Sequence, residues 1–159
     1  MTRLAFTDDE FNHVLSRAQE FYATLGKVRC PYFRGDIRFN PAGLEHLRRK
    51  SWNRGRSRPD QFMRLKFLRM APTILSLSST VQGICHTQER LRRHRHGRWE
   101  ELFSPVTFYE FVAVHENRRF KVIVKQGSGG ELIFWSLIPF WRQSEHGNRL
   151  LHDGNPIED

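Results

Sequence analysis

The amino-acid sequence predicts an α+β domain in which N-terminal helices are followed by an antiparallel β-meander of three to four strands. In the first half of the chain, apolar residues recur at three- and four-residue spacing, as they do on one face of a helix. In the second half, runs rich in Val, Ile, Phe and Tyr are joined by connections of hairpin length. Helices that precede consecutive strands are typical of this fold class.

The first helix is expected to begin at Thr7. The Thr7 hydroxyl can cap the helix, and Glu10, three residues later, completes a capping box. Apolar side chains then form a single stripe as far as about Leu25, and Gly26 follows as a stop signal. We interpret this stripe as part of the hydrophobic core.

A second helix is expected to begin at Asn40 and Pro41, because Asn is a favoured cap and Pro is tolerated in the first turn. This helix should end near Trp52. Just before it, residues 36–39 alternate between polar and apolar side chains, which indicates a brief strand.

A third helix is expected to open at Pro59-Asp60, after a basic segment at residues 51–58 that we interpret as a loop. Pro72 should end or kink this helix, because proline lacks the backbone N–H that a helix interior requires. Residues 74–75 are then expected to continue a last turn.

The strands are expected in the C-terminal half. Residues 81–91 can form a strand or an extended arm, and residues 92–98 are interpreted as an Arg/His loop. Three strand-like runs follow at residues 106–115, 120–126 and 132–140. Their connections are His115-Glu116-Asn117 and the glycine-rich residues 127–130, both of hairpin size.

One domain is therefore expected over residues 1–145, with a helical part at residues 7–79 and a sheet part at residues 81–140. Residues 146–159 are expected to form a loosely ordered tail. The chain has thirteen Phe and four Trp and is 38% hydrophobic, which is sufficient for a core.

Targeting signals are not apparent in the sequence. No run of about 18 apolar residues is present, so no transmembrane helix and no membrane partner are expected. The N-terminus lacks the apolar region and cleavage site of a secretory signal peptide. Cys30 and Cys85 fit no C-x-x-C pattern, so reduced thiols and a cytoplasmic location are expected.

The net charge of +9 is concentrated in the middle of the chain. Residues 45–69 contain nine Lys or Arg against two acidic residues, and residues 86–98 contain five Arg against one Glu. Both ends are mildly acidic. A single arginine is more often an ordinary solvated side chain, but a basic centre between acidic ends favours a polyanionic partner such as a nucleic acid.

Motifs for metal or cofactor chemistry are missing from the sequence. There is no P-loop, no dinucleotide-binding glycine motif, no H-E-x-x-H and no G-x-S-x-G. His86, His94 and His96 stand among arginines without a second pair of ligands at zinc spacing. Carboxylates are not clustered as magnesium requires. We therefore expect no metal and no cofactor.

RNA cleavage remains possible without a metal, because the 2′-hydroxyl is an internal nucleophile and the protein needs only proton-transfer and charge-stabilising groups. His46 lies at the edge of the apolar stripe of the second helix, where it can face a cleft or be a half-buried structural histidine. Ser136 interrupts an apolar strand, and such a hydroxyl needs a hydrogen-bond partner or a role.

The strands and the third helix offer further candidates. In residues 118–126, Phe120, Val122 and Val124 are expected to point to one face and Arg119, Lys121, Ile123 and Lys125 to the other. Tyr109 is a hydroxyl-bearing candidate on the neighbouring strand. A solvent-facing side of the sheet explains these residues equally well. The remaining candidate phosphate contacts are Arg49, Lys50, Arg64, Lys66, Arg92 and Arg93.

Several stretches carry a resemblance to a known superfamily. They are IRFNPAGLEHL at residues 37–47, MRLKFL at 63–68, APTIL at 71–75, YEF at 109–111, FKVIV at 120–124 and IFWSLIP at 133–139. Over residues 37–140 the chain resembles the barnase–EndoU–colicin–RelE superfamily of metal-independent ribonucleases, in particular its phage-associated branch. Residues 92–98 are an addition to that pattern, and the sequence does not clearly assign a glutamate as the partner base of His46.

The resemblance implies a cleft lined by a helical histidine, basic groups of the central strands and a hydroxyl of the last strand. In this chain these residues are His46, Lys121 (or Arg119 or Lys125) and Ser136. The leading hypothesis is an endoribonuclease toxin or effector in which Lys121 and Arg64 neutralise the phosphate and Ser136 and Tyr109 position it.

Such a toxin implies an acidic antitoxin or immunity protein as its partner. Two alternatives remain open. The first is a non-catalytic nucleic-acid-binding module, which would bind RNA with a steep salt dependence and no turnover. The second is a protein-interaction domain for an acidic partner.

Overall fold

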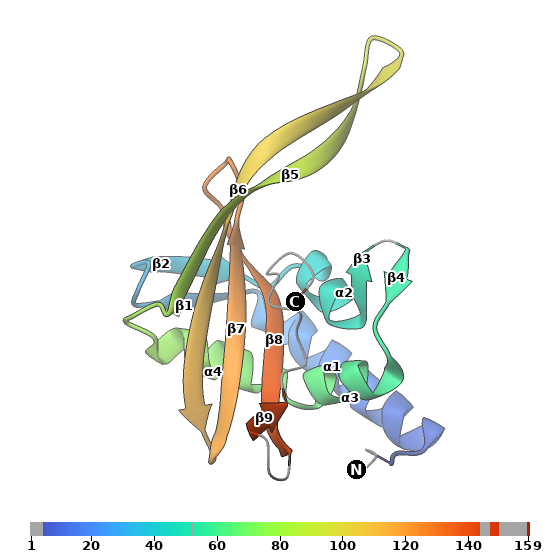
Figure 1. Cartoon of the computed structure of the whole chain (residues 1–159), viewed down its shortest axis with the longest axis vertical. Coiled ribbons are helices and arrows are strands. Elements are labelled where there is room, and N and C mark those ends of the chain that lie inside the picture. The colour runs from blue at the N-terminus through green and yellow to red at the C-terminus, as the bar shows by residue number, and fades with distance from the viewer. Residues whose placement is uncertain (1–4, 52, 144–146, 150–158) are drawn as a thin grey trace.

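The computed structural model describes residues 5–51, 53–143, 147–149 and 159. It confirms the α+β fold class: the helices lie in the N-terminal half and the long strands in the C-terminal half (Figure 1). The helices are α1 (Asp8–Leu25), α2 (Pro41–Arg48), α3 (Arg58–Lys66) and α4 (Met70–Leu77). None of the described helices is both long enough and apolar enough to cross a membrane.

The sheet is larger than the predicted three to four strands. Its order is β1-β2-β8-β7-β6-β5, and β9 pairs with β8. The strands are β1 (Lys27–Cys30), β2 (Gly35–Arg38), β5 (Gly83–Arg95), β6 (Arg98–His115), β7 (Arg118–Gln126), β8 (Leu132–Gln143) and β9 (Gly147–Arg149). The meander β5–β8 is antiparallel as predicted, but β1 and β2 from the helical half extend it past β8.

The helix starts follow the predicted caps. The Thr7 amide donates to the Glu10 carboxylate, and the Glu10 amide donates to the Thr7 hydroxyl, so the capping box closes α1. Asn40 caps α2 through the Gly43 amide. The prediction that this helix ends near Trp52 is wrong, because α2 ends at Arg48 where the backbone becomes extended; Trp52 itself lies outside the described residues.

Two corrections concern the segment after α2. Residues 51–58 are not simply a loop, because β3 (Arg49–Ser51) and β4 (Arg54–Gly55) form a small hairpin there. Pro72 does not end a helix either. It lies in the first turn of α4, where its missing N–H has no intrahelical partner to lose.

The two faces of the sheet are different environments. Phe111, Phe120, Val122 and Phe134 pack into the main core together with residues of the four helices. A smaller apolar group covers the opposite face and consists of Val106, Phe108, Ile123 and Ile138. Alternation along β7 therefore follows the predicted division between Val122 and Val124 on one side and Ile123 on the other.

Residues 92–98 are not a loop but the outer ends of two long strands. β5 and β6 pair continuously from Gly83–Glu110 to Arg95–Arg98, and only His96-Gly97 forms the turn. Both turn residues have positive φ, 52° and 73°, as a two-residue hairpin turn requires. Figure 1 shows this hairpin projecting beyond the rest of the molecule; we call its outer part, residues 90–103, the arm.

The predicted tail, residues 146–159, is only partly described. Gly147–Arg149 form β9 against β8, and residues 146 and 150–158 lie outside the described residues. Asp159 is 1% exposed, and its main-chain oxygen accepts hydrogen bonds from Arg56 and Ser136.

Candidate functional site

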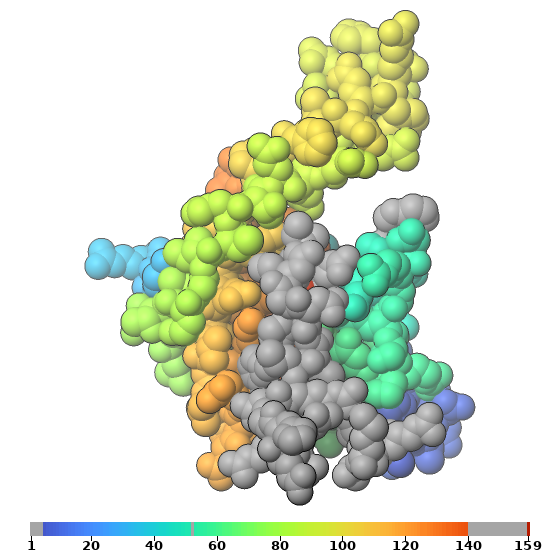
Figure 2. Space-filling view, viewed as in Figure 1, coloured from blue at the N-terminus to red at the C-terminus, as the bar shows by residue number. Residues whose placement is uncertain are grey.

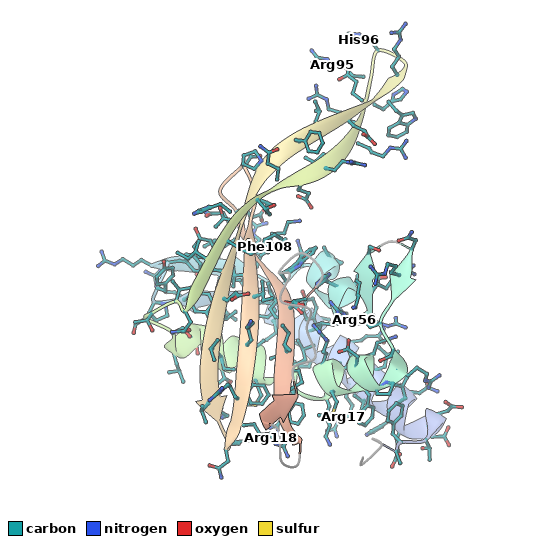
Figure 3. All side chains as sticks on the ribbon, viewed as in Figure 1. Arg17, Arg56, Arg95, His96, Phe108 and Arg118 are labelled. Atoms are coloured by element: carbon teal, nitrogen blue, oxygen red, sulfur yellow. The ribbon has the colours of Figure 1, made fainter. Side chains whose placement is uncertain are left out.

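A group of buried polar side chains lies where α2 and α3 meet β8 (Figures 1 and 3). Each member is at most 9% exposed. We call the group the buried cluster, and it consists of His46, Arg56, Asp60, Arg64 and Ser136. Since buried charged and polar groups are costly unless they are paired, their gathering at one place indicates a specific hydrogen-bonded arrangement.

Gly43 sets the position of α2 on β8. A Cβ at Gly43 would lie 2.4 Å from the Phe134 carbonyl oxygen and 2.6 Å from the Tyr22 hydroxyl, so only glycine permits this approach. Three residues further along α2, the His46 ring stacks on Trp135 with ring centroids 4.2 Å apart. The close approach of helix and strand therefore fixes the imidazole against β8.

Arg64 links α3 to β8. Its Nε donates to Asp60 Oδ1 at 2.6 Å, one helical turn earlier, and its Nη1 donates to Ser136 Oγ at 2.8 Å. The Arg64 side chain is fully buried. The Ser136 hydroxyl, which the sequence indicated as needing a partner, thus has a guanidinium donor.

Arg56 links the segment after β4 to α2. Its Nε donates to the His46 carbonyl oxygen at 2.9 Å, and its Nη2 donates to His46 Nε2 at 3.1 Å. Its Nη1 lies 3.7 Å from Asp60 Oδ2. Two guanidinium groups, those of Arg56 and Arg64, therefore face the Asp60 carboxylate within the cluster.

The main-chain oxygen of Asp159 lies at the centre of the cluster. It accepts hydrogen bonds from Arg56 Nη2 at 3.1 Å, from Arg64 Nη1 and from the Ser136 hydroxyl. We call these three donors, Arg56, Arg64 and Ser136, the cradle. Their convergence on a single oxygen is the arrangement that an oxyanion requires.

His46 is neutral in this arrangement. Burial, together with the nearby positive charges of Arg56, Arg64 and Lys125, lowers the pKa of His46 to about 2. A guanidinium has no acceptor, so His46 Nε2 must be the acceptor in its contact with Arg56. The imidazole next to the cradle is therefore in its neutral form at neutral pH.

Lys125 of β7 stands beside the cluster. Its ammonium group lies 4.4 Å from the centroid of the Trp135 ring, which in turn stacks on His46. The same ammonium contacts Glu89 of β5 at 2.5 Å. Lys125 thus extends the positive charge of the site toward the base of the arm.

The structure brings together only some of the candidates from sequence. His46, Arg64 and Ser136 lie in the cluster, and Lys125 borders it. Lys121 is on the same face of β7 but further along the strand, because Ile123 and not Lys121 is the partner of Ser136. The Lys121 ammonium instead forms an ion pair with Glu110 at 3.6 Å.

Tyr109 lies on the opposite face of the sheet. It pairs with Val124, whose side chain belongs to the main core, and its ring packs against Phe33 at 4.8 Å between centroids. The Tyr109 hydroxyl donates to Gln126 Oε1 at 2.9 Å. The structure therefore does not bring Tyr109 to the cluster.

The remaining phosphate candidates are dispersed. Arg49 and Lys50 are in β3, and Arg49 approaches Glu45 at 3.8 Å. Lys66 lies near the rings of Phe62 and Phe67 and lines a separate hollow between α1 and α3. Arg119 is exposed in β7, and Arg92 and Arg93 are on the arm.

Arg56 and Asp60 are the two cluster residues that were not among the candidates from sequence, and Arg56 is the less expected of them. It lies in the basic stretch 51–58, where one arginine of several gives no sign of being buried. A signal was nevertheless present: Arg56, Asp60 and Arg64 follow one another at four-residue spacing, which places opposite charges side by side near a helix.

Comparisons with known proteins do not place the chain in a family. No family model matches it, and neither the curated proteins nor the solved structures contain a match. Within the described part of the chain, no three His, Cys, Asp or Glu side chains gather in a way that could hold a metal ion. The chemistry of the site must therefore be argued from the cluster itself.

Proposed function

We propose that the buried cluster binds a phosphate of RNA and supports its cleavage by the neighbouring 2′-hydroxyl. The observation that carries this proposal is the cradle: Arg56, Arg64 and Ser136 converge on one oxygen beside the His46 imidazole. A non-bridging phosphate oxygen offers the same acceptor chemistry as the oxygen of Asp159.

The reaction is a transesterification. The 2′-oxygen attacks phosphorus and the bond from phosphorus to the 5′-oxygen breaks, which leaves a 2′,3′-cyclic phosphate and a 5′-hydroxyl. One proton leaves the 2′-hydroxyl and one is delivered to the 5′-oxygen. In the proposal, Arg56 and Arg64 stabilise charge on the phosphate, Ser136 orients it, and Lys125 adds positive charge from β7.

His46 is the proposed proton-transfer group, and its low pKa defines when it can act. A neutral imidazole with a pKa of about 2 does not take up a proton at neutral pH. A phosphate anion in the cradle opposes the positive charges that hold the pKa down, so its binding raises the pKa of His46. Proton transfer is therefore confined to the complex in which RNA has replaced Asp159.

The resemblance to the barnase–EndoU–colicin–RelE superfamily is consistent with this proposal. His46 on a helix and Ser136 on the final long strand are two of the residues it implies, and here their side chains belong to one cluster. Under the proposal the protein is a toxin or effector that acts on RNA in the cytoplasm and is neutralised by an acidic antitoxin or immunity protein.

A second candidate function is a non-catalytic RNA-binding module. The depressed pKa of His46 is the observation that favours it, because an imidazole that stays neutral can bind but not transfer a proton. In this case the cradle holds a phosphate and no bond is broken.

RNA cleavage in the presence of EDTA distinguishes the two functions. The purified protein should convert a labelled single-stranded RNA to fragments with 2′,3′-cyclic phosphate ends, and the His46→Ala variant should lose this activity by about 100-fold or more. His13→Ala, on α1, is the matched control and should cleave as the wild type does. RNA binding without cleavage by the wild type would support the binding module instead.

A further inference from the structure

The arm is a basic, exposed element that the cluster does not explain. Residues 90–103 contain five arginines against two glutamates. Arg90 and Arg93 approach Glu101 and Glu100 at 3.9 Å, and all four side chains are about half exposed. Ion pairs of this kind contribute little to stability, so the arm gains little from its own charges.

Large apolar side chains are also exposed on the arm. Trp99 is 68% exposed and Phe103 is 63% exposed, which is unusual for aromatic residues that only serve folding. Each has an arginine alongside: the Arg92 guanidinium lies 5.7 Å from the centre of the Trp99 ring, and the Arg90 guanidinium 5.8 Å from that of Phe103. Two pairs of an aromatic ring and an arginine thus stand in the solvent.

The pairing of the strands places both rings on one face. Phe103 is opposite Arg90 and Trp99 is opposite His94, and directly opposed residues of an antiparallel pair share a face. Trp99 and Phe103 are four residues apart in β6, or about 13 Å along the strand. The face therefore offers two separated platforms for stacking, with Arg92 and Glu101 between them and Arg90 beside Phe103.

The position of the arm connects it to the cluster. It begins one residue after Glu89, which contacts Lys125 at the border of the cluster. Figure 2 shows the arm leaning over the side of the body that carries β3 and β4, with open space between them. Arg95 and His96 lie at its outer end, well away from Arg56 of the cluster (Figure 3).

We propose that the arm binds single-stranded RNA, with bases stacked on Trp99 and Phe103 and phosphates held by Arg90 and Arg92, which share their face. Proteins that hold single strands combine aromatic platforms with positive charge, and both are present here on an element that serves no core. This proposal rests on the proposed function, because it takes RNA as the ligand. It adds a second site of contact to the same RNA strand, outside the buried cluster.

Binding to RNA that is not cut tests the arm. All variants carry His46→Ala, and the ligand is a fluorescein-labelled 20-nucleotide single-stranded RNA whose anisotropy is followed. Adding Trp99→Ala and Phe103→Ala together should weaken binding by at least about tenfold. Leu77→Ala, at a residue that is 73% exposed on α4, is the matched apolar control and should leave the affinity unchanged.

The salt dependence tests the arginines. Replacing Arg90 and Arg92 with Ala should reduce the slope of log affinity against log salt by about 1.4, since each phosphate contact to a single strand contributes about 0.7. The charge control is Arg17→Ala, which removes an exposed arginine of α1. Because Arg17 makes no phosphate contact in the proposal, the slope should stay that of the background protein. Unfolding in urea verifies that each variant is folded.

The outcomes separate the two proposals. If both arm variants bind RNA as the background protein does, the arm proposal is overturned and the cradle proposal is unaffected. If binding depends on the arm but the protein with His46 intact cleaves no RNA, the proposed catalysis fails and the arm proposal stands. The arm proposal would be overturned if replacing Trp99 and Phe103 weakened the binding of duplex RNA as much as that of single-stranded RNA. It would also be overturned if the arm bound an acidic protein and not RNA.

Discussion

The buried cluster and the arm are both rich in arginine, and they use it in opposite ways. In the cluster, Arg56 and Arg64 are 5% and 0% exposed and their nitrogens donate at 2.6 to 3.1 Å to defined acceptors. On the arm, Arg90 and Arg93 are about half exposed and reach their carboxylates only at 3.9 Å. The same residue type is thus fixed in one region and adaptable in the other.

This difference bears on what each region can recognise. Burying a guanidinium is costly, so its hydrogen bonds must be satisfied by groups at fixed positions, and the cluster offers its donors to one oxygen. Exposed arginines cost little and can follow a flexible backbone. The cluster is therefore suited to binding a single phosphate, and the arm is suited to binding several nucleotides of single-stranded RNA.

Loss of a buried arginine should have the largest effect on stability. Arg64→Ala leaves the Asp60 carboxylate and the Ser136 hydroxyl buried without this donor, and should lower the free energy of unfolding by about 3–5 kcal/mol. Arg93→Ala, on the arm, should change it by no more than about 0.5 kcal/mol. Urea unfolding of both variants measures the contrast, and similar losses would contradict it.

Gly43→Ala should have the next largest effect. The added Cβ would meet the Phe134 carbonyl oxygen and force α2 away from β8, at a cost of about 1–3 kcal/mol in the free energy of unfolding. Because His46 follows on the same helix, the stacking on Trp135 should also be disturbed. Gly127→Ala, in the connection between β7 and β8 where an added Cβ meets nothing within 4 Å, is the matched control and should leave the tryptophan fluorescence and the RNA-cleavage rate unchanged.

The pH dependence of stability should reveal the neutral His46. The unfolded chain takes up a proton at His46 below a pH of about 6.5, whereas the folded protein, with a pKa of about 2, does not. The contribution of His46 is therefore lost as the pH falls below about 6.5, by up to about 1.4 kcal/mol per pH unit. His46→Phe keeps a ring on Trp135 and should flatten the dependence between about pH 6.5 and 5; an unchanged slope would contradict the assignment.

Removal of the Asp159 oxygen from the cradle should strengthen the binding of phosphate. Deleting residues 150–159 takes away the Asp159 oxygen that Arg56, Arg64 and Ser136 now bind, and should strengthen binding of inorganic phosphate by about tenfold. Asp159→Asn keeps the main-chain oxygen and should bind phosphate as the wild type does. Calorimetric titration distinguishes them, and weaker binding after the deletion would show that Asp159 helps to build the site.

The parts of the site that could be predicted depend on local pattern. Alternation in β7 separated Val122 and Val124 from Ile123, because successive side chains of a strand point to opposite faces. Ser136 was recognisable because a hydroxyl within an apolar strand must be satisfied, and Arg64 and Asp159 satisfy it.

Tyr109 shows where local pattern is insufficient. Its face depends on the register between β6 and β7, and that register follows from a two-residue turn at Glu116-Asn117, both at positive φ. With the connection taken as three residues, the pairing of Tyr109 with Val124 cannot be derived. The register, and not the composition of the strand, placed Tyr109 in the main core.

Arg56 and the arm required the three-dimensional structure. Arg56 becomes buried only because the chain returns from β4 to the start of α3 beside α2, which no local pattern of residues 51–58 reveals. The arm resembled a loop because strands of 13 and 18 residues are much longer than usual. The arm is defined by the backbone pairing of β5 with β6, which extends from Gly83 and Glu110 to Arg95 and Arg98.

The most direct test of the central claim is the affinity of the cradle for an RNA phosphate that cannot be cut. A dinucleotide with a 2′-deoxy group at the scissile position should bind the protein that lacks residues 150–159, and Ser136→Ala in the same background should weaken this binding by about tenfold or more. Arg92→Ala, on the arm, should leave the affinity for so short a ligand unchanged. Equal affinity with and without the Ser136 hydroxyl would contradict the assignment of the cradle as the phosphate site.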